Sequence, residues 1–167
     1  MIGAVTGYDP SSWSDFSVAQ AGASAALTGL LFVAMSINLD NILSTDGLPA
    51  RAAETLVFLM NILLVSTLIL VPQRGALLGA EILVVSGVVW ISVVAGKVKA
   101  PPPEDDWRNA YYFNAVVGQV ALIPFLICAV TLIAGSGGGL FWVVPGVILS
   151  LIVAVSNAWV LMVEILR

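Results

Sequence analysis

Histidine is absent from this 167-residue chain, and cysteine occurs once, at Cys128. The lack of histidine removes the commonest metal ligand and the commonest general base near neutral pH. A single cysteine excludes an internal disulfide and a two-cysteine metal site. Charged residues make up only 10% of the chain, and just six are Lys or Arg. That is too few for the charged shell of a soluble domain or for a nucleic-acid surface. We therefore expect no enzyme, no cofactor, no metal centre and no nucleic-acid partner.

Long apolar runs fill most of the remaining sequence. Hydrophobic residues make up 60% of it, and the mean hydropathy is +1.06. Each run holds about 20 mostly uncharged residues, the length at which a helix crosses about 30 Å of hydrocarbon. The sequence predicts an all-α transmembrane bundle that forms a single domain over residues 1–167. The five predicted spans are 16–39, 48–71, 75–95, 111–134 and 140–163.

The distribution of positive charge predicts the orientation in the membrane. Five spans place successive loops on alternating sides, so Arg74 is the only Lys or Arg on one side and the other five lie opposite. Under the positive-inside rule, the N-terminus faces outward and the C-terminus faces the cytoplasm. No Lys or Arg precedes Arg51, so we expect the first span to be retained and not cleaved as a signal peptide.

The first predicted span is the most polar. We define its polar stripe as Gln20, Ser24, Thr28 and Asn38, which share one helix face with Ser17. Two interpretations are open. The span is either the central packing element, bridging to neighbours through this stripe, or it turns the stripe toward a water-filled path. Asp40 follows at the cytoplasmic boundary, where a ring of carboxylates would attract cations. Small residues that permit close helix packing run beside the stripe at Ala21, Ala25, Gly29 and Ser36.

Two carboxylates fall inside later spans. Glu81 lies about two turns into the third span, with no Lys or Arg in the apolar run around it. An isolated carboxylate in hydrocarbon must be neutral, paired or hydrated, and we consider Arg74 and Gln20 as its partners. It is either a structural group or an ion- or proton-handling site. Glu54, near the start of the second span, is interpreted as favouring that helix N-terminus through the macrodipole.

Other polar side chains recur within the apolar runs. A secondary polar stripe in the fifth span contains Ser150, Asn157 and Glu164, spaced seven residues apart. Asn61 and Gln119 fall near the middle of the second and fourth spans, where they are expected to bond across helix interfaces. Together these residues predict a bundle with a partly polar interior.

The segment GASAALTGLLFVAMSINL at 22–39, followed by LPARAAE at 48–54, resembles a group of small bacterial membrane proteins without an assigned activity. The resemblance covers the first two spans. It implies a location in the bacterial cytoplasmic (inner) membrane and carries no further function.

Two functions fit these observations. The first is a homo-oligomeric channel or pore for ions or small solutes, with the first span facing the symmetry axis. Its candidate path residues are Gln20, Ser24, Thr28, Asn38, Asp40 and Glu81. The alternative is a non-catalytic accessory subunit of a larger membrane complex. The small residues of the first span and the stiff loop from Pro101 to Asp106 suit that alternative.

Overall fold

The computed structural model describes residues 6–45, 47–99 and 108–165, and it is helical through nearly all of them. The loop from Pro101 to Asp106 lies outside the described residues. A short 3-10 helix, η1 (Pro10–Trp13), leads into α1 (Ser14–Ile37) and the short α2 (Leu39–Ser44). The remaining elements are α3 (Leu48–Leu70), α4 (Gly75–Lys99), α5 (Arg108–Ala134), the 3-10 helix η3 (Gly139–Trp142) and α6 (Val143–Ile165).

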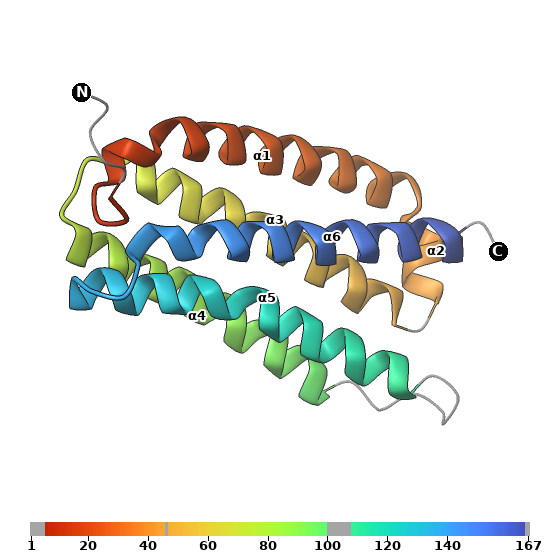
Figure 1. Ribbon diagram of the computed structural model, residues 1–167. Helices are drawn as coiled ribbons and strands as arrows, with labels where there is room; N and C mark the ends of the chain where they lie inside the picture. The colour runs from red at the N-terminus through yellow and green to blue at the C-terminus, as the bar shows by residue number, and fades with distance from the viewer. Residues whose placement is uncertain (1–5, 46, 100–107, 166–167) are drawn as a thin grey trace.

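Five of these helices are long and apolar enough to cross a membrane, which confirms the predicted number of spans. Their bounds differ from the predicted ones by a few residues, as expected where helix ends extend into the interface. The chain is a multi-pass integral membrane protein. The first and last described residues lie at opposite ends of the bundle (Figure 1). We call these ends outer and inner, following the predicted orientation.

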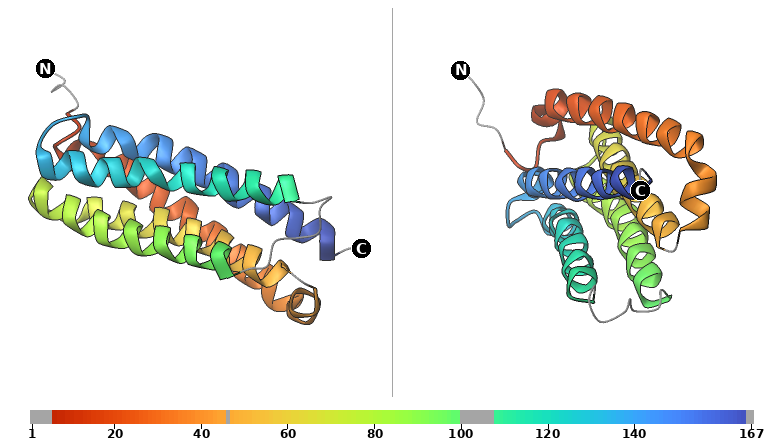
Figure 2. Two further views of the ribbon diagram at one scale, coloured as in Figure 1. Left: turned by 90° about the horizontal axis from the view of Figure 1, so that it is seen from below. Right: turned by 90° about the vertical axis from the view of Figure 1, so that its right-hand side faces the viewer.

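The central helix is α3, which contacts α1, α4 and α6. The pair α4 and α5 packs together on one side, and α1 lies alone on the other (Figures 1 and 2). Only 6% of the apolar window of the first span is buried, against 44% for α3. The interpretation of the first span as the central packing element is therefore wrong. The hydroxyl groups of Ser24 and Thr28 bond to the backbone of their own helix, so these two residues need no polar neighbours on other helices.

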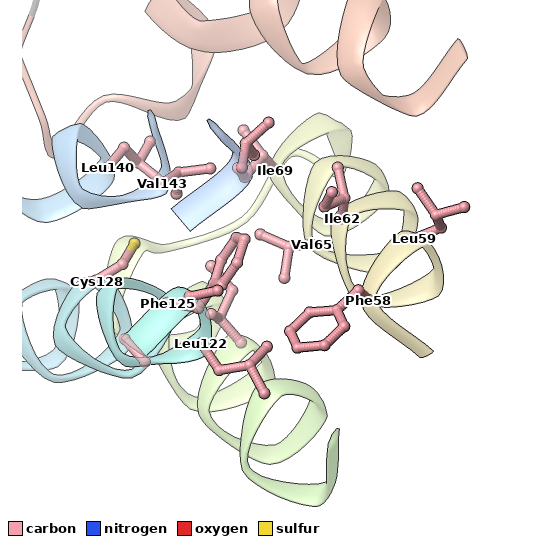
Figure 3. Packing of buried hydrophobic residues seen from close by; sticks show 14 of the residues in the cluster. Phe58, Leu59, Ile62, Val65, Ile69, Leu122, Phe125, Cys128, Leu140 and Val143 are labelled. Carbon is pink, nitrogen blue, oxygen red and sulfur yellow. The ribbon is translucent and has the colours of Figure 1, made fainter. Parts of the chain in front are cut away.

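An apolar core closes the centre of the bundle. Phe58, Val65, Leu122 and Phe125 point toward one another from α3 and α5 (Figure 3), and all four are fully buried. Close helix approach supports this packing at Gly79, where an added Cβ would lie 2.8 Å from a backbone oxygen of α5. The centre of the single bundle is therefore packed with side chains.

The outer end is fastened by a contact that the sequence did not suggest. The backbone N–H of Leu140 donates to the carbonyl of Gly7 at 2.7 Å, and the N–H of Gly138 donates to the Tyr8 hydroxyl at 2.8 Å. A Cβ on Gly139 would collide with the Gly7 backbone, and Gly139 has a φ of 57°. We call this contact the outer clasp. It ties the segment before α1 to the turn between α5 and α6.

Candidate functional site

The polar stripe of α1 faces the rest of the protein. Ser24 is buried, and its hydroxyl donates to the carbonyl of Gln20 at 2.6 Å. Thr28 donates in turn to the carbonyl of Ser24 at 2.7 Å, and the Asn38 amide donates to the carbonyl of Ala34 at 2.9 Å. Gln20, Thr28 and Asn38 are half-buried. Ser24, Thr28 and Asn38 therefore each donate a side-chain hydrogen bond to a backbone carbonyl of α1, while the stripe lies against the bundle.

The opposite side of α1 is exposed along its whole length. The exposed residues on this side form two series, each with a spacing of seven residues, which places each series on one helix face. The second series begins four residues after the first, so the two lie next to each other. No heavy atom of the described chain lies within 4 Å of a Cβ built on Gly22 or Gly29, so this face has no intramolecular partner there. We call it the heptad face. Its exposed members are Asp15, Ala19, Gly22, Ala26, Gly29, Val33 and Ser36.

The inner end of α1 carries a further acid. Asp40, in α2, is exposed, as is Asp15 near the start of α1. Within the described ranges, neither carboxylate forms an ion pair. The structure places Asp40 at the end of the bundle and away from Glu81, so these two candidate path residues do not form one site.

Three polar pairs lie along α4 at different depths: two join it to α3, and the third joins it to the turn between α3 and α4. They lie near the inner end, in the middle and near the outer end of the bundle. In each pair, one side chain donates a hydrogen bond that the other accepts. We call this series the polar seam. Its pairs are Glu54–Lys97, Asn61–Ser86 and Gln73–Glu81.

The inner pair is an ion pair. Lys97 Nζ lies 2.8 Å from Glu54 Oε2, and the two side chains are 22% and 9% exposed. A Cβ added to Gly118 of α5 would lie 3.2 Å from Glu54 Oε1, so α5 packs closely over the carboxylate. Glu54 therefore does more than favour its helix N-terminus. Sequence spacing could not reveal this role, because the partner lies 43 residues away.

The middle pair is fully buried. Ser86 donates its hydroxyl hydrogen to Asn61 Oδ1 at 3.1 Å, so the expected bond of Asn61 across a helix interface is confirmed. Gln119 was expected to form a similar bond, but in the described part of the chain its Oε1 is buried without a hydrogen-bond partner. Ser150 is also buried with an unpartnered hydroxyl. Asn157 is buried on the same helix, and Glu164 belongs to α6 with its side chain outside the described residues.

The outer pair holds Glu81. Gln73 Nε2 donates to Glu81 Oε2 at 2.7 Å and also lies 3.3 Å from the carbonyl of Leu68 at the end of α3. Glu81 is half-buried. Its partner is thus Gln73 and not Arg74 or Gln20, because the turn between α3 and α4 folds the glutamine back over α4 while Arg74 remains exposed.

The polar seam is not a continuous path. Fully buried apolar side chains occupy the levels between its pairs, among them Phe58, Ile62 and Ile82. Within the described segments, no three His, Cys, Asp or Glu side chains gather as metal ligands would. What the seam can do is fix the register of two membrane helices, because lipid offers no partner to the groups that it pairs; Asn61 Nδ2 is buried without a hydrogen bond in the described part.

Comparisons with protein-family models, with curated proteins and with solved structures found no match to this chain.

Proposed function

We propose that this protein is a non-catalytic subunit of a membrane assembly, and that the heptad face of α1 receives a transmembrane helix of a different protein. The observation that supports this proposal is the exposed series of Gly, Ala and Ser on a helix that, among the long helices, packs chiefly against α3. The resemblance of the first two spans supports placing the assembly in the bacterial inner membrane.

The physical reason lies in how membrane helices associate. Lipid tails are as apolar as leucine, so helices gain little from burying large side chains and more from close backbone contact. Gly22, Ala26 and Gly29 leave the backbone of α1 open to such contact. Their seven-residue repeat matches a left-handed crossing of about 20°, as in coiled coils. A helix that served only as a lipid-facing wall would not need this repeat.

Charge favours a different protein over a second copy of this chain. Asp40 is exposed beside the inner end of α1. Transmembrane helices commonly carry Lys or Arg at their cytoplasmic boundary, which would complement this carboxylate. Two copies related by a two-fold axis along the heptad face would instead bring Asp40 toward its own counterpart, and like charges repel.

The homo-oligomeric pore predicted from the sequence has less support. A water-filled path needs a polar wall, but the polar stripe of α1 lies against the bundle. The exposed side of α1 presents Leu30, Phe32 and Val33 beside its small residues. The exposed large residues of α4, α5 and α6 in the described part are likewise apolar, such as Val84, Val116 and Ile152.

Purification from native membranes in a mild detergent tests the proposal. We expect one different membrane protein to co-purify in a fixed ratio, and we expect the double variant Gly22→Leu and Gly29→Leu to lose it. Gly96→Leu on α4 is the matched control, since that glycine also has no heavy atom within 4 Å of its added Cβ. A closed homo-oligomer, or a partner retained by the double variant, would contradict the proposal. Ion flux into vesicles that contain the purified protein alone would support the pore instead.

A further inference from the structure

The outer pair of the polar seam contains a carboxylate whose only side-chain partner in the described structure is neutral. Glu81 accepts one hydrogen bond from Gln73 at 2.7 Å, and it is half-buried within a membrane-spanning helix. The inner pair provides the contrast within the same molecule, because Glu54 faces the ammonium of Lys97 at 2.8 Å. One acid has its charge compensated by a cation, and the other does not.

We propose that Glu81 is a proton-binding site of the outer leaflet, at which the carboxylate takes up a proton from the outer aqueous side and releases it again. The step converts the carboxylate to the neutral acid and needs no other reactant. Gln73 is a positioning residue, since its amide holds one carboxylate oxygen and leaves the other available to a proton. This inference does not depend on the proposed partner helix.

The neighbouring elements contain little that could neutralise Glu81 otherwise. The helices that pack against α4 are α3 and α5. Beyond Glu54, α3 carries one ionisable side chain, Arg51, which lies nearer the inner end and away from Glu81. Among the α5 residues with described side chains (115–134), only the thiol of Cys128 is ionisable, and it is buried in the core. Removing a lone carboxylate from water is costly, whereas the neutral acid is tolerated in an apolar setting.

The other charged or titratable groups described at the outer end lie before or at the start of a helix. They are Tyr8, Asp9, Asp15 and Arg74. Asp9 is engaged by Ser11 and Ser12, and the Tyr8 hydroxyl accepts a hydrogen bond in the outer clasp. The Arg74 side chain is exposed and, within the described residues, ion-pairs with no acid. A proton from the outer solution is therefore the simplest charge to balance Glu81.

Labelling with dicyclohexylcarbodiimide tests the proposal, because this apolar reagent reacts with protonated carboxyl groups in membranes. The purified protein in lipid vesicles would be labelled over a range of pH and the modified peptides identified by mass spectrometry. We expect labelling of Glu81 to decrease as pH rises. We also expect it to exceed labelling of Glu54 about tenfold or more, because Lys97 Nζ already occupies the Glu54 carboxylate as an ion-pair partner.

Variants distinguish a proton-binding carboxyl group from one that only reacts with the label. Glu81→Gln should abolish the label. Gln73→Leu should change the pH profile of labelling at Glu81 and leave that at Glu54 unchanged, because only Glu81 loses a hydrogen bond. Equal labelling of the two glutamates, labelling of Glu81 that does not vary with pH, or no labelling at all would overturn the proposal. The comparison of Glu81 with Glu54 uses the wild-type protein, so it stays decisive if a variant fails to fold.

Discussion

Replacing Lys97 with methionine should destabilise the bundle more than any other removal of a single charge in the described structure. The substitution keeps the length of the side chain but leaves the Glu54 carboxylate, which is 9% exposed, without its cation. At 2.8 Å and an effective dielectric constant of about 20, the attraction is about 6 kcal/mol before desolvation. Desolvation offsets much of this, so we expect Lys97→Met to lower the free energy of unfolding by about 3 kcal/mol.

A double-mutant cycle isolates the ion pair from the other interaction of Lys97. Glu54→Gln should cost about 1–2 kcal/mol, less than Lys97→Met, because the lysine left behind is 22% exposed and reaches water more easily. The double variant removes both charges, so its cost should fall below the sum of the two. We expect a coupling energy of about 2 kcal/mol.

Unfolding in mixed micelles of mild detergent and SDS, followed by tryptophan fluorescence, would measure these free energies. Arg74→Met is the matched control, because it removes one positive charge from an exposed side chain that makes no ion pair among the described residues. It should change stability by less than about 0.5 kcal/mol. A coupling energy below about 0.5 kcal/mol, or equal costs for Lys97→Met and Arg74→Met, would refute the reasoning.

Three further predictions follow from close backbone approach and from the outer end. Gly79→Leu should lower the free energy of unfolding by about 3 kcal/mol or more, because α5 fills the space beside this glycine. Gly87→Leu on the same helix should change it little, and unfolding in mixed micelles would compare the two variants. Gly139→Ala should cost about 2–3 kcal/mol through its left-handed φ and its collision across the outer clasp, whereas Gly47→Ala, which meets open space, should cost about 1 kcal/mol. Hydrogen bonds from the neighbouring serines lower the pKa of Asp9, so its stabilising effect on η1 is present above its ordinary 3.8 and is lost as pH falls through the lower folded value. A shift in tryptophan emission in this acid range that Asp9→Asn removes would confirm it, and the same shift in the variant would contradict it.

The positions of the helices could be predicted well because length and hydropathy leave a long apolar run no other structure in a bilayer. The packing of α3 against α4 could also be predicted, because too few residues separate these two helices for them to lie apart. The seam pairs required more. A glutamate within a span must find some partner, but sequence alone offers several candidates at the same depth, and the turn selected Gln73 over Arg74.

The clearest difference between expectation and structure concerns α1. Its stripe of Gln20, Ser24 and Thr28 suggested either a helix at the centre or a wall facing water. The structure places this helix at the edge, a position open to it because the Ser24 and Thr28 hydroxyls bond to the carbonyl four residues earlier and need no neighbouring helix. Hydroxyl groups that bond to their own helix therefore do not indicate whether protein, lipid or water lies next to that helix face.

Composition and helix length were enough to establish from the residues alone that this protein lies in a bilayer, that it has five spans and that polar side chains lie among them. Tertiary structure decided which groups became partners and which side of α1 stayed exposed. Those outcomes depend on the rotation and depth of each helix relative to the others. Such geometry is set by many weak contacts among residues far apart in the chain, as the pairing of Glu54 with Lys97 illustrates.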